Sequence, residues 1–117
     1  MKENALKEKS FVFAVMIVNC YKNLVDLKKE YVLTKQILRS GTSVGAMIRE
    51  AQHAESKSDF IHKLSIAQKE INETIYWLEL LSSTEYISKE IFEDLNNKST
   101  ELIKLLTSSI KTAKTTL

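Results

Sequence analysis

The chain contains two glycines and no proline among its 117 residues, and this shortage restricts its fold more than any other feature. β-Hairpins, sandwiches and glycine-rich phosphate loops depend on turns that favour these two residues. A chain of this length is expected to form one domain that buries roughly two-thirds of its unfolded surface. The sequence therefore predicts a single all-α domain over residues 1–117.

The clearest helical pattern lies in residues 58–81. Apolar side chains recur there every three or four residues, which is the spacing of one face of an α-helix with about 3.6 residues per turn. Ser56, Ser58 and Asp59 stand at its start, with side-chain oxygens that can cap the first turn. The stretch predicts the central packing helix of a helical bundle. Its apolar face comprises Phe60, Leu64, Ala67, Ile71, Ile75 and Leu78, widened by Trp77 and Leu81.

The same spacing on either side of this stretch predicts three more helices. Thr34 and Ser88 stand where they can cap the second and fourth helices. Residues 1–9 are polar and are expected to be loose or to form a frayed helical start. Because the connections are short, successive helices are expected to be antiparallel neighbours in an up-down-up-down four-helix bundle. The four expected helices span residues 10–29, 34–54, 58–82 and 88–114.

Each of these three helices has an apolar face that is expected to line the core. Gly41 and Gly45 interrupt the second helix, where each costs about 1 kcal/mol relative to alanine. Lying four residues apart on one side, they are expected either to let another backbone approach closely or to mark a kink or break near residues 41–43. The faces comprise Phe13, Ile17, Tyr21 or Cys20, Leu24 and Leu27; Ile37, Gly41, Val44, Ile48 and Ala51; and Ile91, Leu95, Leu102, Leu106, Ile110 and Ala113.

The first predicted helix is apolar around most of its circumference in its earlier half. Val12, Val15 and Met16 occupy much of the side that is polar in the later half. One explanation is a deeply buried central helix, and the other is a contact between subunits. Exposed apolar patches usually mark contacts, so we expect a homo-oligomer whose interface includes Val12, Val15 and Met16.

The N-terminal region has a superficial similarity to a secretory signal, because lysines precede the apolar run of residues 11–18. Glu3 and Glu8 interrupt the basic lead, and no small-residue cleavage site follows. The run is also shorter than the ~20 residues that span a bilayer. Cys20 is the only cysteine, so no internal disulfide can form and a reducing compartment is expected. The sequence predicts a cytoplasmic protein without membrane attachment.

Two pairs of residues have the spacing of metal ligands in ferritin-like bundles. Glu50 and His53 match Glu-x-x-His, and Asp59 and His62 form an Asp variant of it. Both pairs lie opposite the apolar faces of their helices, so they are expected to face solvent or a neighbouring subunit. No metal and no cofactor are therefore expected.

Candidate catalytic groups are equally isolated. Cys20 has no histidine nearby in the sequence and occupies the place of a small buried hydrophobe. Glu70 and Glu73 lie close to Lys69, a pattern typical of a solvated ion-pair face. No catalytic residues are identified, and we expect a protein that is not an enzyme.

One charge arrangement stands out, on the outward side of the second predicted helix. Its basic residues include the only two arginines of the chain, with Thr42 and Ser43 beside them and only Glu50 opposing. Arginine's fork suits phosphate oxygens, and hydroxyl groups add donors. A solvated helix face, or salt bridges across a subunit contact, is the alternative. The net charge is only +2, but a ring of copies would multiply its field. The candidate nucleic-acid-binding residues are Lys35, Arg39, Arg49 and His53.

A set of short motifs in the second and third predicted helices is found together in a known family. The motifs are Arg39-Ser40, Ser43-Val44, Ile48, Glu50-Ala51, Ser58-Asp59-Phe60, Leu64, Ala67, Glu70, Glu73-Thr74 and Tyr76-Trp77-Leu78. In these motifs the chain resembles the four-helix bundle proteins encoded in intervening sequences of bacterial 23S ribosomal RNA genes. Related members are accessory proteins to the reverse transcriptase of diversity-generating retroelements. The resemblance implies a homopentameric ring, a partner that is structured RNA or a reverse-transcriptase-like protein, and no catalytic residues.

Residues and resemblance together predict a non-enzymatic, oligomeric bundle. It is expected to bind structured RNA or a ribonucleoprotein through a weakly basic surface, by contacts to backbone phosphates. The alternative is a protein-interaction scaffold or accessory subunit that does not bind nucleic acid.

Overall fold

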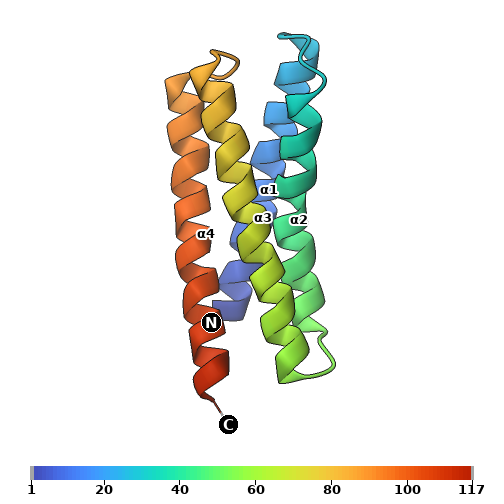
Figure 1. Ribbon diagram of the computed structural model, residues 1–117, viewed down its shortest axis with the longest axis vertical. Coiled ribbons are helices and arrows are strands. Elements are labelled where there is room, and N and C mark those ends of the chain that lie inside the picture. The colour runs from blue at the N-terminus through green and yellow to red at the C-terminus, as the bar shows by residue number, and fades with distance from the viewer. Residues whose placement is uncertain (1, 117) are drawn as a thin grey trace.

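The computed structural model describes residues 2–116, which form four helices and no strand (Figure 1). Each helix packs against two others, so that α1 and α3 both contact α2 and α4. The molecule is elongated along the helices, with extents of 50 × 21 × 19 Å. The predicted all-α four-helix bundle is confirmed. The helices are α1 (Lys2–Asp26), α2 (Leu33–Gln52), α3 (Lys57–Ser83) and α4 (Lys89–Thr115).

The predicted apolar faces form the core along most of the bundle. In α3, Leu64, Ala67, Ile71, Leu78 and Leu81 are buried, whereas Phe60, Ile75 and Trp77 are only half-buried. The prediction that Leu27 and Ile91 are buried in the core was wrong, because Leu27 is 75% exposed and Ile91 is 43% exposed. Leu27 follows the last residue of α1, and Ile91 lies in the first turn of α4. Both therefore stand at helix ends, where the helical spacing no longer guarantees a facing partner.

The first helix begins about two turns earlier than the sequence predicted. α1 starts at Lys2, so of the two alternatives for residues 2–9 the helical start is confirmed and the loose segment is wrong, while Met1 lies outside the described residues. Leu6 is 1% exposed and lies two helical turns before Phe13 on the same face. Ser10 is also buried, and its hydroxyl donates to the carbonyl of Lys7 at 3.1 Å. One buried leucine thus anchors a segment whose other residues, apart from Ala5, are polar.

The start of α2 is capped by a residue that sequence reasoning missed. Thr34 was the predicted cap, but its amide lies inside the helix, and the N-cap residue Val32 supplies no side-chain hydrogen bond. The Glu30 carboxylate instead accepts from the amides of Val32 at 3.1 Å, Leu33 at 2.9 Å and Thr34 at 2.8 Å. Glu30 is only 8% exposed. One carboxylate therefore satisfies three of the four amides that a helix start leaves unpaired.

Two other predicted caps are confirmed. Ser56 accepts a hydrogen bond from the amide of Asp59 at 3.0 Å at the start of α3. Ser88 accepts one from the amide of Ile91 at 3.1 Å at the start of α4, with Glu90 in the first turn. Both follow the usual pattern of a serine three residues before the bonded amide.

The two glycines of α2 lie against α1, and the expected approach of another backbone is seen at Gly45, whereas Gly41 makes room for the side chain of Ile17. A Cβ atom at Gly41 would stand 2.8 and 2.9 Å from the Cγ atoms of Ile17, which is too close for real carbon atoms. At Gly45 it would meet the carbonyl oxygen of Ser10 at 3.5 Å, an ordinary contact. α2 runs without interruption from Leu33 to Gln52, so the alternative of a break is wrong.

Candidate nucleic-acid and subunit interface

Three of the four candidate phosphate-binding residues lie on the exposed side of α2, and the fourth, His53, is its C-cap residue. Lys35, Arg39, Arg49 and His53 are exposed, and the helical rise of about 1.5 Å per residue spreads them over about 27 Å. We call them the α2 ridge. Their exposure matches the direction predicted from the spacing of the core residues. Their role in binding phosphates stays a prediction.

Arg39 is not free on this ridge. Its guanidinium forms salt bridges to two carboxylates of α3, with Nη1 3.0 Å from Glu70 Oε2 and Nη2 bonded to Glu73. The Arg39 side chain remains 51% exposed. Lys69 was the expected cation near the two glutamates, but their partner lies on the neighbouring helix. Two carboxylates thus meet one guanidinium, and a phosphate would have to compete with Glu70 and Glu73 for it.

The two hydroxyl groups beside the ridge are occupied within their own helix. Thr42 Oγ1 donates to the carbonyl of Leu38 at 2.7 Å, and Ser43 Oγ donates to that of Arg39 at 2.6 Å. Such back-bonding to the preceding turn is common for serine and threonine inside helices. Because both hydroxyl groups already donate to carbonyls of their own helix, they are not available as the phosphate donors that the sequence suggested.

The acidic residue next to Arg49 in α2, Glu50, is paired with a lysine of α3. Glu50 Oε1 lies 3.1 Å from Lys63 Nζ. The hydrogen bond to Glu50, together with the charge of the carboxylate, raises the pKa of the Lys63 ammonium. His53 and His62 are both exposed, and residues 2–116 contain no group of three side chains able to hold a metal ion. Glu50 thus opposes Lys63 more directly than it opposes Arg49.

A contact that sequence reasoning missed joins α1 to the ridge. The Arg49 guanidinium lies over the ring of Phe11, 5.7 Å from its centroid, within the range of a cation–π interaction. Phe11 is nonetheless 57% exposed. Phe11 is the first residue of the apolar run 11–18, and this run is the only feature of the sequence that suggests a contact at Phe11. The pairing itself needs the register of α1 against α2, which the sequence does not provide.

The predicted interface residues fall into two groups. Val12 is 50% exposed and Val15 is 44% exposed, so they form an apolar strip on α1 beside Phe11. Met16 is half-buried and packs against the core. Phe11, Val12 and Val15 together are called the α1 strip. Whether a second subunit covers the strip stays a prediction.

A second basic surface lies on α4, which is not in contact with α2 in the described residues. Lys104, Lys111 and Lys114 are exposed and make no salt bridge with any side chain of residues 4–116. Residues 102–116 contain these three lysines and no acidic residue, a signal present in the sequence. These lysines of α4 therefore offer a charge-matched control surface against which substitutions in the α2 ridge can be compared.

Comparison with known proteins identifies close relatives. A family model described as 23S rRNA-intervening sequence protein matches residues 2–108. A crystal structure of a protein of unknown function from the S23 ribosomal protein family of Bacteroides thetaiotaomicron is 64% identical. The match covers 95% of this chain and 99% of that one, with a TM-score of 0.94. No curated protein matches. Neither description names an enzymatic activity. None of the helices in residues 2–116 combines the length and the apolar content of a membrane-spanning segment.

Proposed function

This chain belongs to the 23S rRNA-intervening sequence protein family, and from that membership we propose that it is a non-enzymatic bundle that binds structured RNA through backbone phosphates. The observation that supports the proposal is the α2 ridge. Lys35, Arg49 and His53 are exposed there without a carboxylate partner among the described side chains, while Glu50 is held by Lys63. The ridge offers charge and hydrogen-bond donors along one line, which fits a phosphate backbone better than a single small ligand.

Binding of this kind is electrostatic and does not depend on base sequence. Each lysine or arginine that neutralises a phosphate releases counterions, so affinity falls steeply with salt. Arg39 contributes less than the sequence suggested, because Glu70 and Glu73 already neutralise it. The net charge of one chain is only +2, and several copies presenting their ridges together would strengthen the field.

We expect Lys35→Ala/Arg49→Ala to weaken binding of a hairpin RNA. The affinity should fall about tenfold at low salt, and the slope of log affinity against log salt should decrease by about 1.5, because two phosphate contacts are lost. Fluorescence anisotropy at several salt concentrations measures both quantities. The matched control is Lys104→Ala/Lys111→Ala, which removes the same charge from α4.

Each outcome of this comparison has a distinct meaning. Loss of affinity in the α2 variant alone would support the ridge. Equal loss in both variants would show that total charge matters and the ridge does not. A wild-type protein that does not bind RNA, or binds it independently of salt, would contradict the proposed function.

The proposed assembly is a ring of copies that bury the α1 strip. Phe11, Val12 and Val15 are large apolar side chains exposed together on one helix, which is unusual on a surface that stays in water. Five copies is the number implied by the family resemblance. In this proposal each protomer is an antiparallel up-down-up-down bundle. Pairings between helices support that arrangement, including Ser10 with Gly45, Ile17 with Gly41, Ser40 with Thr74, and Glu50 with Lys63.

Val15→Glu is expected to dissociate the assembly without unfolding the protomer. A carboxylate buried against apolar side chains of a partner should raise the dissociation constant at least about 100-fold. Light scattering would report the mass and circular dichroism the helicity. Leu27→Glu introduces the same charge at another exposed apolar position and should leave the mass unchanged. A wild-type monomer at micromolar concentration would refute the assembly.

A protein-interaction scaffold is the second candidate, and the pairing of Arg39 favours it. The ridge is partly neutralised, so its remaining charges could meet a protein partner as readily as a phosphate backbone. Partners captured from a lysate before and after nuclease treatment separate the candidates. Partners that persist after nuclease support the scaffold, and partners that are lost support RNA binding.

A further inference from the structure

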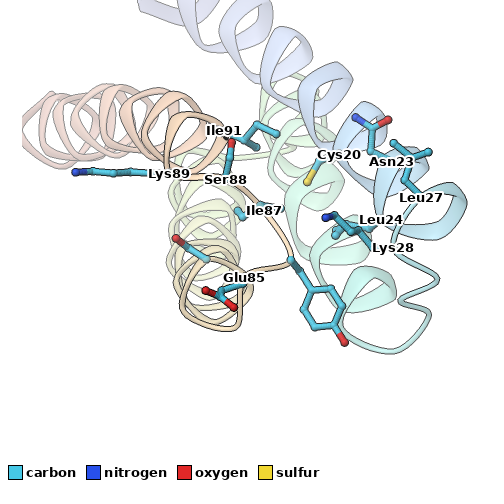
Figure 2. Close-up of a pocket in the computed structure, with 12 residues that line it drawn as sticks. Cys20, Asn23, Leu24, Leu27, Lys28, Glu85, Ile87, Ser88, Lys89 and Ile91 are labelled. Atoms are coloured by element: carbon cyan, nitrogen blue, oxygen red, sulfur yellow. Dashed lines mark hydrogen bonds between the residues drawn. The ribbon is translucent and has the colours of Figure 1, made fainter.

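The apolar core is open at one end of the bundle (Figure 2). A pocket of about 600 Å³ lies between the end of α1 and the connection from α3 to α4. Cys20, Leu24 and Leu27 line it from the α1 side, and Ile87 and Ile91 line it from the other side. Its volume lies within the range of about 300–1,000 Å³ that is typical of small-molecule sites.

The walls of this pocket are core positions that lack a cover. Leu24 and Ile87 are 1% and 8% exposed and form an apolar floor. Leu27 and Ile91 continue the apolar faces of α1 and α4, yet they are only partly covered and remain 75% and 43% exposed. Aliphatic surface that stands beside a preformed pocket favours an apolar ligand body.

The charged groups around the pocket favour an anion. Lys28 and Lys89 line it together with one carboxylate, that of Glu85. Lys89 extends away from the pocket in Figure 2 and lies 3.9 Å from Glu93, whereas Lys28 lies beside Leu24. Lys28 is exposed and makes no salt bridge among the described side chains. The N-terminus of α4 also borders the pocket and adds the positive end of a helix dipole.

We propose that this pocket binds a small amphipathic carboxylate of fatty-acid chemistry. The hydrocarbon chain lies against Cys20, Leu24 and Ile87 and covers Leu27 and Ile91. The carboxylate lies at the mouth of the pocket. Lys28 pairs with it there, since this cation has no other carboxylate to neutralise it. The site is separate from the α2 ridge, and the proposal does not depend on RNA binding.

Cys20 provides a reporter inside the site. Its thiol is buried, and that burial raises its pKa to about 11, so the free protein should react slowly with an alkylating reagent at pH 8. A ligand in the pocket should slow the reaction further. Decanoate at about 100 times its dissociation constant leaves about 1% of the sites open and should slow alkylation about 100-fold. Decylamine, with the same chain and the opposite charge, should bind about tenfold more weakly.

The test compares two charge reversals on the full chain, using calorimetric titration and Cys20 alkylation, with both ligands below their micelle-forming concentrations. Lys28→Glu should reverse the preference, so that decylamine binds more tightly than decanoate. Lys22→Glu is the matched control, because Lys22 is exposed on α1 and does not line the pocket, and it should keep the wild-type preference. Absence of decanoate binding to the wild type, equal binding of the two ligands, or the same effect from both reversals would overturn the proposal.

Discussion

Glu30→Ala is expected to lower the free energy of unfolding by about 2–3 kcal/mol. The Glu30 carboxylate accepts from three backbone amides at 2.8–3.1 Å, and at 8% exposure it leaves water little access to replace it. Alanine leaves these amides without their acceptor at the positive end of α2, where a negative charge is also favourable. Urea denaturation followed by circular dichroism measures the loss, at one protein concentration so that any assembly contributes equally.

Two further variants separate the cap from a general effect of charge. Glu30→Gln keeps one carbonyl oxygen and should lose about half as much stability as Glu30→Ala, since the remaining oxygen can still accept. Glu55→Ala removes an exposed carboxylate and should change the free energy by less than about 0.5 kcal/mol. If Glu30→Ala and Glu55→Ala were equally stable, the cap would not contribute to stability.

Alanine at the two glycines of α2 is expected to change stability in opposite directions. Gly41→Ala places a Cβ atom 2.8 and 2.9 Å from two Cγ atoms of Ile17, which is fully buried in the core. Overpacking of this kind costs about 1–3 kcal/mol and should outweigh the gain of about 1 kcal/mol in helix propensity. Gly45→Ala meets only an ordinary contact at 3.5 Å and should gain about 0.5–1 kcal/mol.

A double-mutant cycle identifies the cause of the Gly41 effect. In an Ile17→Ala background the clash is absent, so Gly41→Ala should become neutral or stabilising there. The measurement is again the free energy of unfolding in urea. Two glycine variants that shift stability in the same direction would mean that packing against Ile17 does not decide the residue at position 41.

The helices were predictable because one periodic property, burial of one face, repeats along each of them. At helix ends fewer helices lie alongside to cover a periodic apolar residue. For this reason Leu27 and Ile91 were predicted to lie in the core, although both are exposed. The burial of Leu6 was also missed, since one large apolar residue in an otherwise mostly polar segment shows no period. Glu30 was missed as a cap because it lies two residues before the N-cap residue, and its side chain reaches forward to the amides of residues 32–34. The usual capping serine or threonine is itself the N-cap residue.

The sequence was enough to predict which side of α2 the candidate residues face, but not which of their charges are neutralised by other helices. The spacing along α2 was enough to place Lys35, Arg49 and His53 on the exposed side. The carboxylates that meet Arg39 lie more than 30 residues away in the sequence, on α3. Only the register between two helices decides which charges meet. The net charge of the ridge therefore could not be obtained from the helix that carries it.

The corner between α1 and α2 has a consequence for how copies of this chain can exchange parts. Glu30 accepts from three amides of the following residues, and its own amide donates to the carbonyl of Leu24 at 3.0 Å. Domain swapping between protomers requires a hinge to straighten, and straightening this corner would break these four hydrogen bonds together. A swapped dimer, if the chain ever forms one, should therefore open at a different connection.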